Sequence, residues 1–175
     1  EERNVKKHIF LIGFMGCGKS TNAKFLAEMT GKIRTEMDDE IAAEKGMEVQ
    51  TIFRKYGETY FRDLETELIK KLAFREPSVV SCGGGAVLRE ENVAMMKEEG
   101  LVVLLTASPE TVYERIHGMG DRPVLKGNMN VPYIRELMEK RRPSYEAAAD
   151  FRVATDGKTA EEICREILEL VSAQA

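Results

Sequence analysis

The chain has 175 residues, 43% of them hydrophobic, a size at which one hydrophobic core is usual and two complete domains are not. Its 30 Asp and Glu residues outnumber 26 Lys and Arg residues, and the net charge of -4 disfavours binding to nucleic acid. The apolar runs fall far short of the roughly 20 residues of a membrane span, and the N-terminus has no apolar signal-peptide core. We therefore expect one domain over residues 1–175, cytoplasmic and monomeric, without nucleic-acid or membrane partners.

Short apolar runs alternate with helical patterns along the chain. A strand predicted over 8–12 ends at glycine and precedes helical spacing over 19–29. Further strands are predicted over 33–35, 79–81, 101–105 and 151–154, and further helices over 90–97, 110–116 and 159–171. The last helix begins at a capping-box pattern of Thr159 and Glu162. This alternation predicts an α/β fold, with a parallel sheet covered by helices on both faces.

Two segments interrupt this alternation. Residues 38–74 show a helical pattern with breaks at Gly46 and Gly57, which predicts a helical substrate-binding region beside the sheet. Residues 118–128 are rich in glycine and charge and lack periodicity, so we expect a mobile loop there.

Residues 13–20, Gly-Phe-Met-Gly-Cys-Gly-Lys-Ser, match the phosphate-binding pattern GxxxxGKS between a predicted strand and a predicted helix. The glycines let backbone amides turn toward phosphate oxygens, and the helix N-terminus adds the positive end of its dipole. Lys19 would reach the β and γ phosphates of ATP, and Ser20 offers a hydroxyl group to Mg²⁺. We therefore predict a nucleotide site that comprises Gly16, Cys17, Gly18, Lys19, Ser20 and, at the start of the helix, Thr21. A simple glycine-rich turn is the disfavoured alternative.

The cysteines and histidines form no recognisable metal or disulfide pattern. Cys17, Cys82 and Cys164 are widely spaced and contain no CxxC pair. Near His8 and His117 the sequence has no Ser, Cys or second His at the spacing of a catalytic or metal-binding motif. Cys17 lies inside the phosphate-binding loop, where positive surroundings could make it reactive. A small buried side chain is the favoured interpretation of Cys17 and of Cys82.

Three further clusters could hold the group that receives the phosphate. They are the carboxylates of 36–41, the helix start at 57–65 with Arg62, and the glycines of 83–85. All lie near the carboxyl ends of predicted strands, where α/β sheets bind ligands. Arg62 could pair with a carboxylate, Asp38 could accept hydrogen bonds from hydroxyl groups, and bare glycine backbone permits close approach. Together they predict a site for a polyhydroxylated acid, although each alone could be an ordinary helix charge or turn.

The order of these motifs resembles that of the shikimate kinases. GxxxxGKS, a DxD-like element, GE followed by FRxxE, GGG, an RP loop and RxPxY follow one another over about residues 8–170. The resemblance implies a P-loop kinase fold with five parallel strands in the order 2-3-1-4-5. It also implies transfer of the γ-phosphoryl group of ATP to the 3-hydroxyl of shikimate, in aromatic amino-acid biosynthesis.

The resemblance also assigns roles to individual residues. Shikimate would be bound by Asp38, Arg62, Gly83, Gly84, Gly85 and Arg141. Arg122 would be the arginine of a lid over 118–128, and Arg115 would lie against adenine. Lys19, Asp38 and Arg122 would be catalytic, with Asp38 orienting the hydroxyl group; the residues leave open whether Asp38 is also a general base.

One residue departs from the usual pattern of the family. Glu36 stands where the family has the first aspartate of DxD, and its side chain is one methylene longer. Ser20 and Glu36 are therefore the expected Mg²⁺ residues.

Two alternative functions remain open. A gluconate or nucleoside monophosphate kinase would share the phosphate loop but would not require FRxxE together with GGG. A regulatory protein that binds nucleotide without turnover is the rival from another class.

Overall fold

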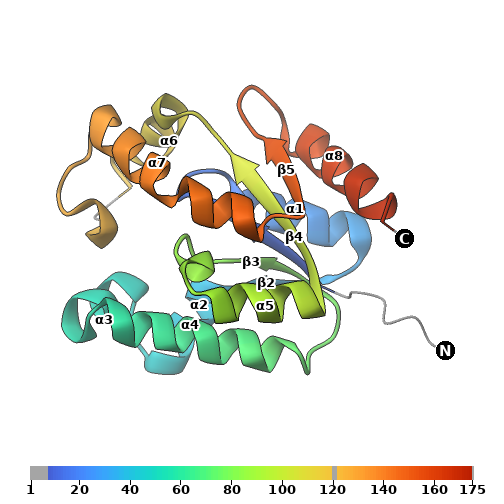
Figure 1. Cartoon of the computed structure of the whole chain (residues 1–175), viewed down its shortest axis with the longest axis horizontal. Coiled ribbons are helices and arrows are strands. Elements are labelled where there is room, and N and C mark those ends of the chain that lie inside the picture. The colour runs from blue at the N-terminus through green and yellow to red at the C-terminus, as the bar shows by residue number, and fades with distance from the viewer. Residues whose placement is uncertain (1–7, 120–121, 175) are drawn as a thin grey trace.

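The computed structural model describes residues 8–119 and 122–174 of the chain. Its centre is a sheet of five parallel strands (Figure 1). The strands are β1 His8–Ile12, β2 Ile33–Glu36, β3 Ser78–Ser81, β4 Gly100–Thr106 and β5 Phe151–Ala154. They pair in the order β2-β3-β1-β4-β5, which confirms the order implied by the resemblance.

The central strands form the floor of the hydrophobic core. Every residue of β1 and of β3 is buried, whereas the edge strands β2 and β5 are partly exposed. This is the pattern of a parallel sheet covered on both faces, because buried strands read as continuous apolar runs. Strand β1 has the bounds that its apolar run predicts.

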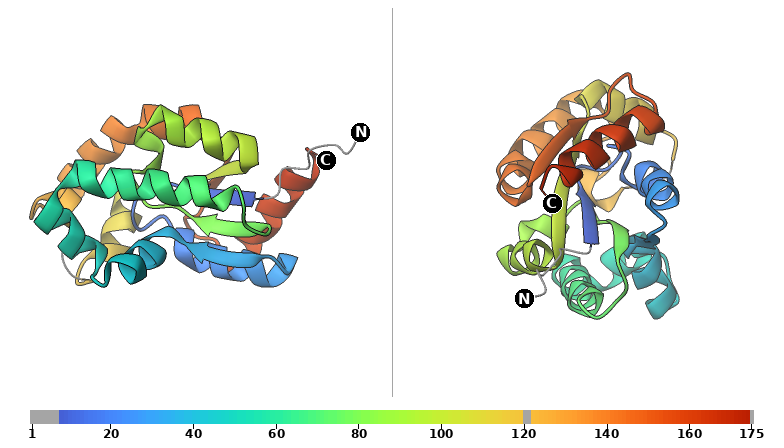
Figure 2. Two further views of the ribbon diagram at one scale, coloured as in Figure 1. Left: turned by 90° about the horizontal axis from the view of Figure 1, so that it is seen from below. Right: turned by 90° about the vertical axis from the view of Figure 1, so that its right-hand side faces the viewer.

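Helices cover both faces of the sheet (Figure 2). They are α1 Lys19–Thr30, α2 Met37–Lys45, α3 Val49–Tyr56, α4 Glu58–Leu72, α5 Glu90–Glu99, α6 Pro109–Ile116, α7 Val131–Ala148 and α8 Ala160–Ser172. Helices α1 and α8 pack together on one face, and α5 and α7 lie on the other with α4 beside α5. Within the described residues, no helix is long and apolar enough to cross a membrane.

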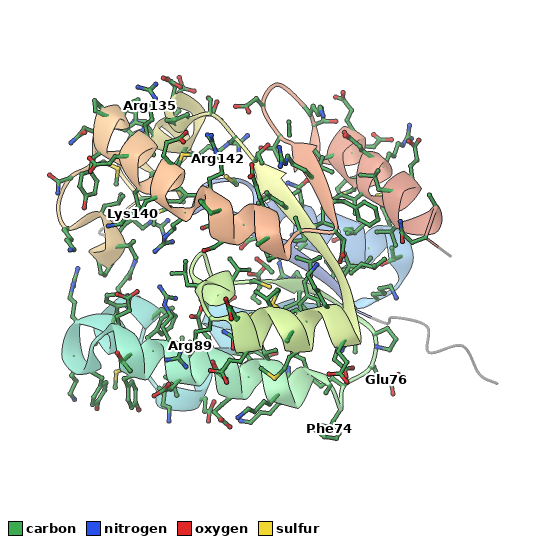
Figure 3. All side chains as sticks on the ribbon, viewed as in Figure 1. Phe74, Glu76, Arg89, Arg135, Lys140 and Arg142 are labelled. Carbon is green, nitrogen blue, oxygen red and sulfur yellow. The ribbon has the colours of Figure 1, made fainter. Side chains whose placement is uncertain are left out.

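The helical segment predicted over 38–74 consists of α2, α3 and α4. Gly46 and Gly57 separate them with φ angles of 65° and 90°, so the predicted breaks are confirmed. The segment ends in a turn at Phe74, which is 92% exposed and projects away from the sheet (Figure 3). The predicted capping box of α8 is also confirmed, since Thr159 and Glu162 satisfy each other's backbone amides.

Helix α7 was not predicted from the sequence patterns. Its start is capped by the side chain of Asn130, which accepts a hydrogen bond from the amide of Tyr133. Pro143 lies inside the helix and usually signals a helix end, because it lacks an amide proton. Two of the buried side chains of α7 are polar or amphipathic, Arg141 and Tyr145, so its apolar stripe is weak in the sequence.

The segment predicted as a loop over 118–128 contains a short 3₁₀ turn, η2 Pro123–Leu125. Gly120 and Asp121 lie outside the described residues. Leu125 is buried, which anchors the described end of this segment to the rest of the protein. Its mobility stays a prediction.

Candidate active site

The phosphate-binding loop joins β1 to α1 at the carboxyl end of the sheet. Gly13, Gly16 and Gly18 have positive φ angles of 147°, 77° and 91°, which residues with a side chain rarely adopt. A methyl group on Gly13 would also lie 2.5 Å from the carbonyl oxygen of Leu105. The glycines of the motif are thus required by both backbone conformation and space. Thr21 is exposed in the first turn of α1.

Lys19 is held inside this loop. Its Nζ atom donates hydrogen bonds to the carbonyl oxygens of Gly13, at 2.7 Å, and Phe14, at 3.0 Å. Burial lowers the pKa of the Lys19 ammonium, and the nearby Asp38 carboxylate opposes that shift. An anionic group in the loop would favour the charged form further. The ammonium is therefore enclosed by the backbone of the loop.

Ser20 and Glu36 lie side by side at the mouth of the loop. The Ser20 hydroxyl donates to Oε2 of Glu36 at 3.0 Å, and its Oγ lies 3.5 Å from Oγ of Ser81. Burial raises the pKa of Glu36, against the hydrogen bonds from Ser20 and Ser81. Its Oε1 atom is buried and has no hydrogen-bond partner among the described residues. A hydroxyl group and a carboxylate with a spare oxygen fit a hydrated divalent cation.

A cavity of about 400 Å³ opens beside the phosphate-binding loop. Seven segments contribute to its wall: the phosphate-binding loop through Met15, α2, α3, α4, the loop after β3, the segment around η2, and α7. The side chains and backbone that line it include Asp38, Phe53, Phe61, Arg62, Gly83, Gly84, Gly85, Arg122, Pro123 and Arg141. The structure thus gathers in one place all the residues that the sequence assigns to an acceptor.

Arg62 is fixed in the wall of the cavity by an ion pair. Only 7% of its surface is exposed, and its Nη1 donates to Oε1 of Glu65 at 2.6 Å. The guanidinium also packs against Gly85, where an added methyl group would lie 2.3 Å from Cζ of Arg62. Its Nε atom is buried without a hydrogen-bond partner in the described part of the chain. Arg62 is therefore held in one orientation with donor capacity to spare.

Glu65 is a residue that the sequence interpretation left without a role. It is fully buried, and one of its oxygens, Oε2, has no hydrogen-bond partner within residues 8–119 and 122–174. Burial raises the pKa of Glu65, whereas the Arg62 charge opposes that shift. One feature of the sequence could have predicted the ion pair: Glu65 lies three residues after Arg62, a spacing at which side chains on a helix contact each other. Glu65 is the glutamate of the FRxxE pattern, but exposed pairs at this spacing are so common that the pattern does not reveal its burial.

Asp38 projects from the first turn of α2 into the cavity. Water reaches its carboxylate through the open cavity, although the surrounding walls are close enough for desolvation to raise its pKa. The Lys19 charge opposes this shift most strongly, with smaller contributions from Arg62 and Arg122. We expect the shift to increase when a ligand displaces the water. The carboxylate thus lies in the combined field of three cations.

Arg141 and Arg122 complete the cationic lining of the cavity. Arg141 is 7% exposed, and its guanidinium lies over the ring of Phe14, 5.9 Å from the centroid. The Nε atom of Arg122 is buried without a hydrogen-bond partner among the described residues. By contrast, Arg142 is exposed on the surface of α7, where it pairs with Glu139 (Figure 3). Arg141 and Arg142 are neighbours in the sequence, but Arg141 faces the cavity and Arg142 faces solvent.

Arg115 lies outside the cavity. Its Nη1 donates to the carbonyl oxygen of Gly16 at 2.9 Å and to Oγ1 of Thr155 at 3.2 Å. These bonds place it on the outer side of the phosphate-binding loop, beside the turn after β5. It is therefore close to the nucleotide loop but separate from the acceptor residues.

Cys17 is buried within the phosphate-binding loop. Burial raises the pKa of its thiol above the ordinary value, against the positive charges of Lys19 and Arg115. The thiol is therefore protonated at neutral pH, and the alternative of a reactive thiolate is wrong. The favoured interpretation as a small buried side chain is confirmed for Cys17 and for Cys82, which is also buried.

The model of the family described as shikimate kinase matches residues 15–172. The shikimate kinase of Persephonella marina is 46% identical over 93% of this chain and 97% of the relative. That of Geobacter sulfurreducens is 42% identical over 94% of this chain and 91% of the relative. The structure of shikimate kinase from Acinetobacter baumannii in complex with shikimate has a TM-score of 0.90 at 32% identity, covering 96% of this chain and 94% of that one. A gluconokinase from Sinorhizobium meliloti, at 22% identity and a TM-score of 0.65, shares the fold alone.

Proposed function

The chain belongs to the shikimate kinase family, and on this premise we propose that it transfers the γ-phosphoryl group of ATP to the 3-hydroxyl of shikimate. The product, shikimate 3-phosphate, belongs to aromatic amino-acid biosynthesis. The observation that carries the proposal is the cavity beside the phosphate-binding loop. Two buried arginines, Arg62 and Arg141, line it together with Asp38, and these are the groups that a carboxylate with several hydroxyl groups requires.

Arg62 and Arg141 are the proposed partners of the shikimate carboxylate. Both guanidinium groups are largely buried, so their attraction for an anion is weakly screened by solvent. Asp38 accepts hydrogen bonds from the hydroxyl groups. The loop of Gly83, Gly84 and Gly85 has no side chains, so the ring of the acceptor can approach its backbone closely.

ATP binds along the loop from Gly16 to Thr21 in this proposal. The backbone amides of Gly16, Cys17 and Gly18 contact phosphate oxygens, and Lys19 exchanges its bonds to loop carbonyls for the β and γ phosphates. Arg115 lies against adenine. Its bonds to Gly16 and Thr155 support this role, because they fix the side chain beside the loop.

Ser20 and Glu36 are the proposed Mg²⁺ residues. Within the described ranges there is no group of three or more His, Cys, Asp or Glu side chains that could hold a metal. A site with few protein ligands suits Mg²⁺, which keeps several waters and takes other ligands from phosphates. When bound, the ion neutralises charge on the β and γ phosphate oxygens.

The proposed catalysis rests on positioning and charge. Asp38 orients the 3-hydroxyl toward the γ phosphate and takes its proton, while Lys19 stabilises the negative charge of the transferring group. Arg122 arrives from the segment 118–128, proposed as a lid that closes over the phosphates. Its position in the cavity wall, with an unpartnered buried Nε, supports a role that requires a ligand.

An acceptor panel tests this function. ADP release should depend on shikimate and stay at the background rate with gluconate, with nucleoside monophosphates and without an acceptor. Preference for gluconate or a nucleoside monophosphate would replace the proposed acceptor. Nucleotide binding without turnover on any of them would favour the regulatory-protein alternative.

Replacing Arg62 by lysine should weaken shikimate binding by about 1.5–3 kcal/mol, or roughly 10- to 150-fold. Lysine is a point charge that cannot contact Glu65 and a substrate carboxylate through one planar group. Calorimetric titration with shikimate measures the loss. Arg142→Lys, which changes an exposed arginine outside the cavity, should bind like the wild type. Unchanged affinity in Arg62→Lys would remove Arg62 from the acceptor site.

Replacing Glu36 by aspartate should change the Mg²⁺ concentration that gives half-maximal activity, with nearly unchanged affinity for shikimate. The shorter side chain withdraws the carboxylate from Ser20, which it contacts at 3.0 Å. Activity is measured across a Mg²⁺ titration for both proteins. Superimposable titrations would show that Glu36 lies outside the metal shell.

A further inference from the structure

We propose that Tyr145 is a positioning residue of the acceptor site: its hydroxyl group holds the backbone of Gly84 in place beside Arg141. This inference rests on the proposed function, because it assigns a role at the site where shikimate would bind. Tyr145 itself lies behind the cavity wall and is distinct from the residues that face the acceptor.

A short hydrogen bond joins Tyr145 to the glycine loop. The hydroxyl group, on α7, donates to the carbonyl oxygen of Gly84 at 2.6 Å. Gly83 lies against Asp38 and Glu65, and Gly85 lies against the guanidinium of Arg62. A displacement of Gly84 would therefore change the contacts of both neighbouring glycines with charged groups of the site.

The glycine loop depends on such bonds because it has no side chains to pack. At its start, the amide of Cys82 donates to the carbonyl oxygen of Leu11 at 3.1 Å. After its end, the side chain of Asn92 donates to the carbonyl oxygen of Ala86 at 2.9 Å. The carbonyl oxygens of Gly83 and Gly85 accept hydrogen bonds from the amides of Ala86 and Leu88, both at 3.1 Å. The bond from Tyr145 holds the carbonyl oxygen of Gly84 between them.

The ring of Tyr145 is packed in the hydrophobic core, with 6% of its surface exposed. It also lines a second cavity of about 340 Å³, whose other walls include Phe14, Leu105 and Met138. Packing therefore positions the ring, and the hydroxyl group adds the direct bond to the glycine loop. Removing the hydroxyl group alone tests that bond, because the ring and its packing remain.

The second arginine of the site also lies beside the glycine loop. Arg141 is four residues before Tyr145 on α7, on the same face of the helix, and its Nη1 atom would lie 3.5 Å from a methyl group added to Gly84. The phenol donates its single proton to Gly84, so the same bond fixes the backbone that faces Arg141. Burial raises the pKa of the Tyr145 hydroxyl, so the proton needed for the bond to Gly84 is retained at neutral pH.

The test is Tyr145→Phe, which keeps the ring and removes the hydroxyl group. We expect the KM for shikimate to rise about 3- to 10-fold, the range for one lost hydrogen bond, with the KM for ATP within about twofold of the wild type. Tyr133→Phe removes a hydroxyl group from the same helix outside both cavities, and it should leave both constants unchanged.

Two outcomes would overturn the inference. One is an unchanged KM for shikimate in Tyr145→Phe; the other is an equal rise in both KM values, which indicates general loosening of the fold. The wild-type measurement separates failure of the proposed function from failure of this inference. If the wild type does not phosphorylate shikimate, the function is wrong; if it does and the variant matches it, only the role of Tyr145 is wrong.

Discussion

Asp38→Asn is expected to lower kcat about 10²- to 10⁴-fold, the usual contribution of a positioned general base. Asparagine has nearly the same shape and can still contact a hydroxyl group, so the KM for shikimate should change much less. The carboxylate is central because it lies near Lys19, Arg62 and Arg122 and faces the cavity. Steady-state kinetics at saturating ATP and Mg²⁺ measure both constants.

The pH profile gives the same prediction a second readout. Because desolvation raises the pKa of Asp38, the acid limb of the wild-type kcat/KM should lie above the ordinary aspartate pKa of about 3.9. Activity should fall as the pH drops through that raised value, since the protonated acid cannot accept the hydroxyl proton. This limb should be absent from Asp38→Asn.

The neighbouring carboxylate offers a matched control. Asp39 raises the pKa of Asp38 by charge repulsion, so Asp39→Asn should move the acid limb to lower pH and retain most of the activity. A near-normal kcat in Asp38→Asn, or the same acid limb as the wild type, would exclude Asp38 as the base.

Arg122→Ala is expected to lower kcat by roughly 10²-fold or more, as removal of a phosphoryl-clamping arginine does. Affinity for shikimate should change little, because a charge delivered on closure stabilises the transition state more than the ground state. Arg122 lines the cavity together with Pro123, which restricts the backbone next to it. Kinetics at saturating ATP measure the loss.

The control for Arg122 comes from the same segment. Lys126→Ala removes an exposed cation from it and should leave kcat within about twofold, as for most surface changes. Hydrogen exchange across residues 118–128, with and without nucleotide, tests the lid independently. Normal turnover in Arg122→Ala, joined to exchange that nucleotide does not alter, would contradict both the lid and its arginine.

Much of the fold could be predicted from the sequence because its signals are local. The run 8–12 is apolar throughout and ends at glycine, and β1 has these bounds. The breaks at Gly46 and Gly57 follow from backbone conformations that glycine favours. The phosphate-binding loop is local as well, since its eight residues contain both the glycines and the lysine.

The features that could not be predicted depend on burial between distant segments. Helix α7 was missed because Pro143 signals a break and because Arg141 and Tyr145 occupy positions of its buried face. Only the resemblance pointed to Arg141. Glu65 looks like a surface charge until α4 is packed, when it becomes fully buried beside Arg62. The cytoplasmic location and the monomeric state stay predictions.

The most direct test of the account is the identity of the phosphorylated product. The protein is incubated with ATP, Mg²⁺ and shikimate, and the product is analysed by proton NMR with coupling to ³¹P. Phosphorus coupling at the proton on C3 of the ring, formed in step with ADP, is the predicted result. A phosphoryl group on another oxygen, or ADP formed without any phosphorylated shikimate, would contradict the arrangement of Asp38, Arg62 and Arg141 around the acceptor.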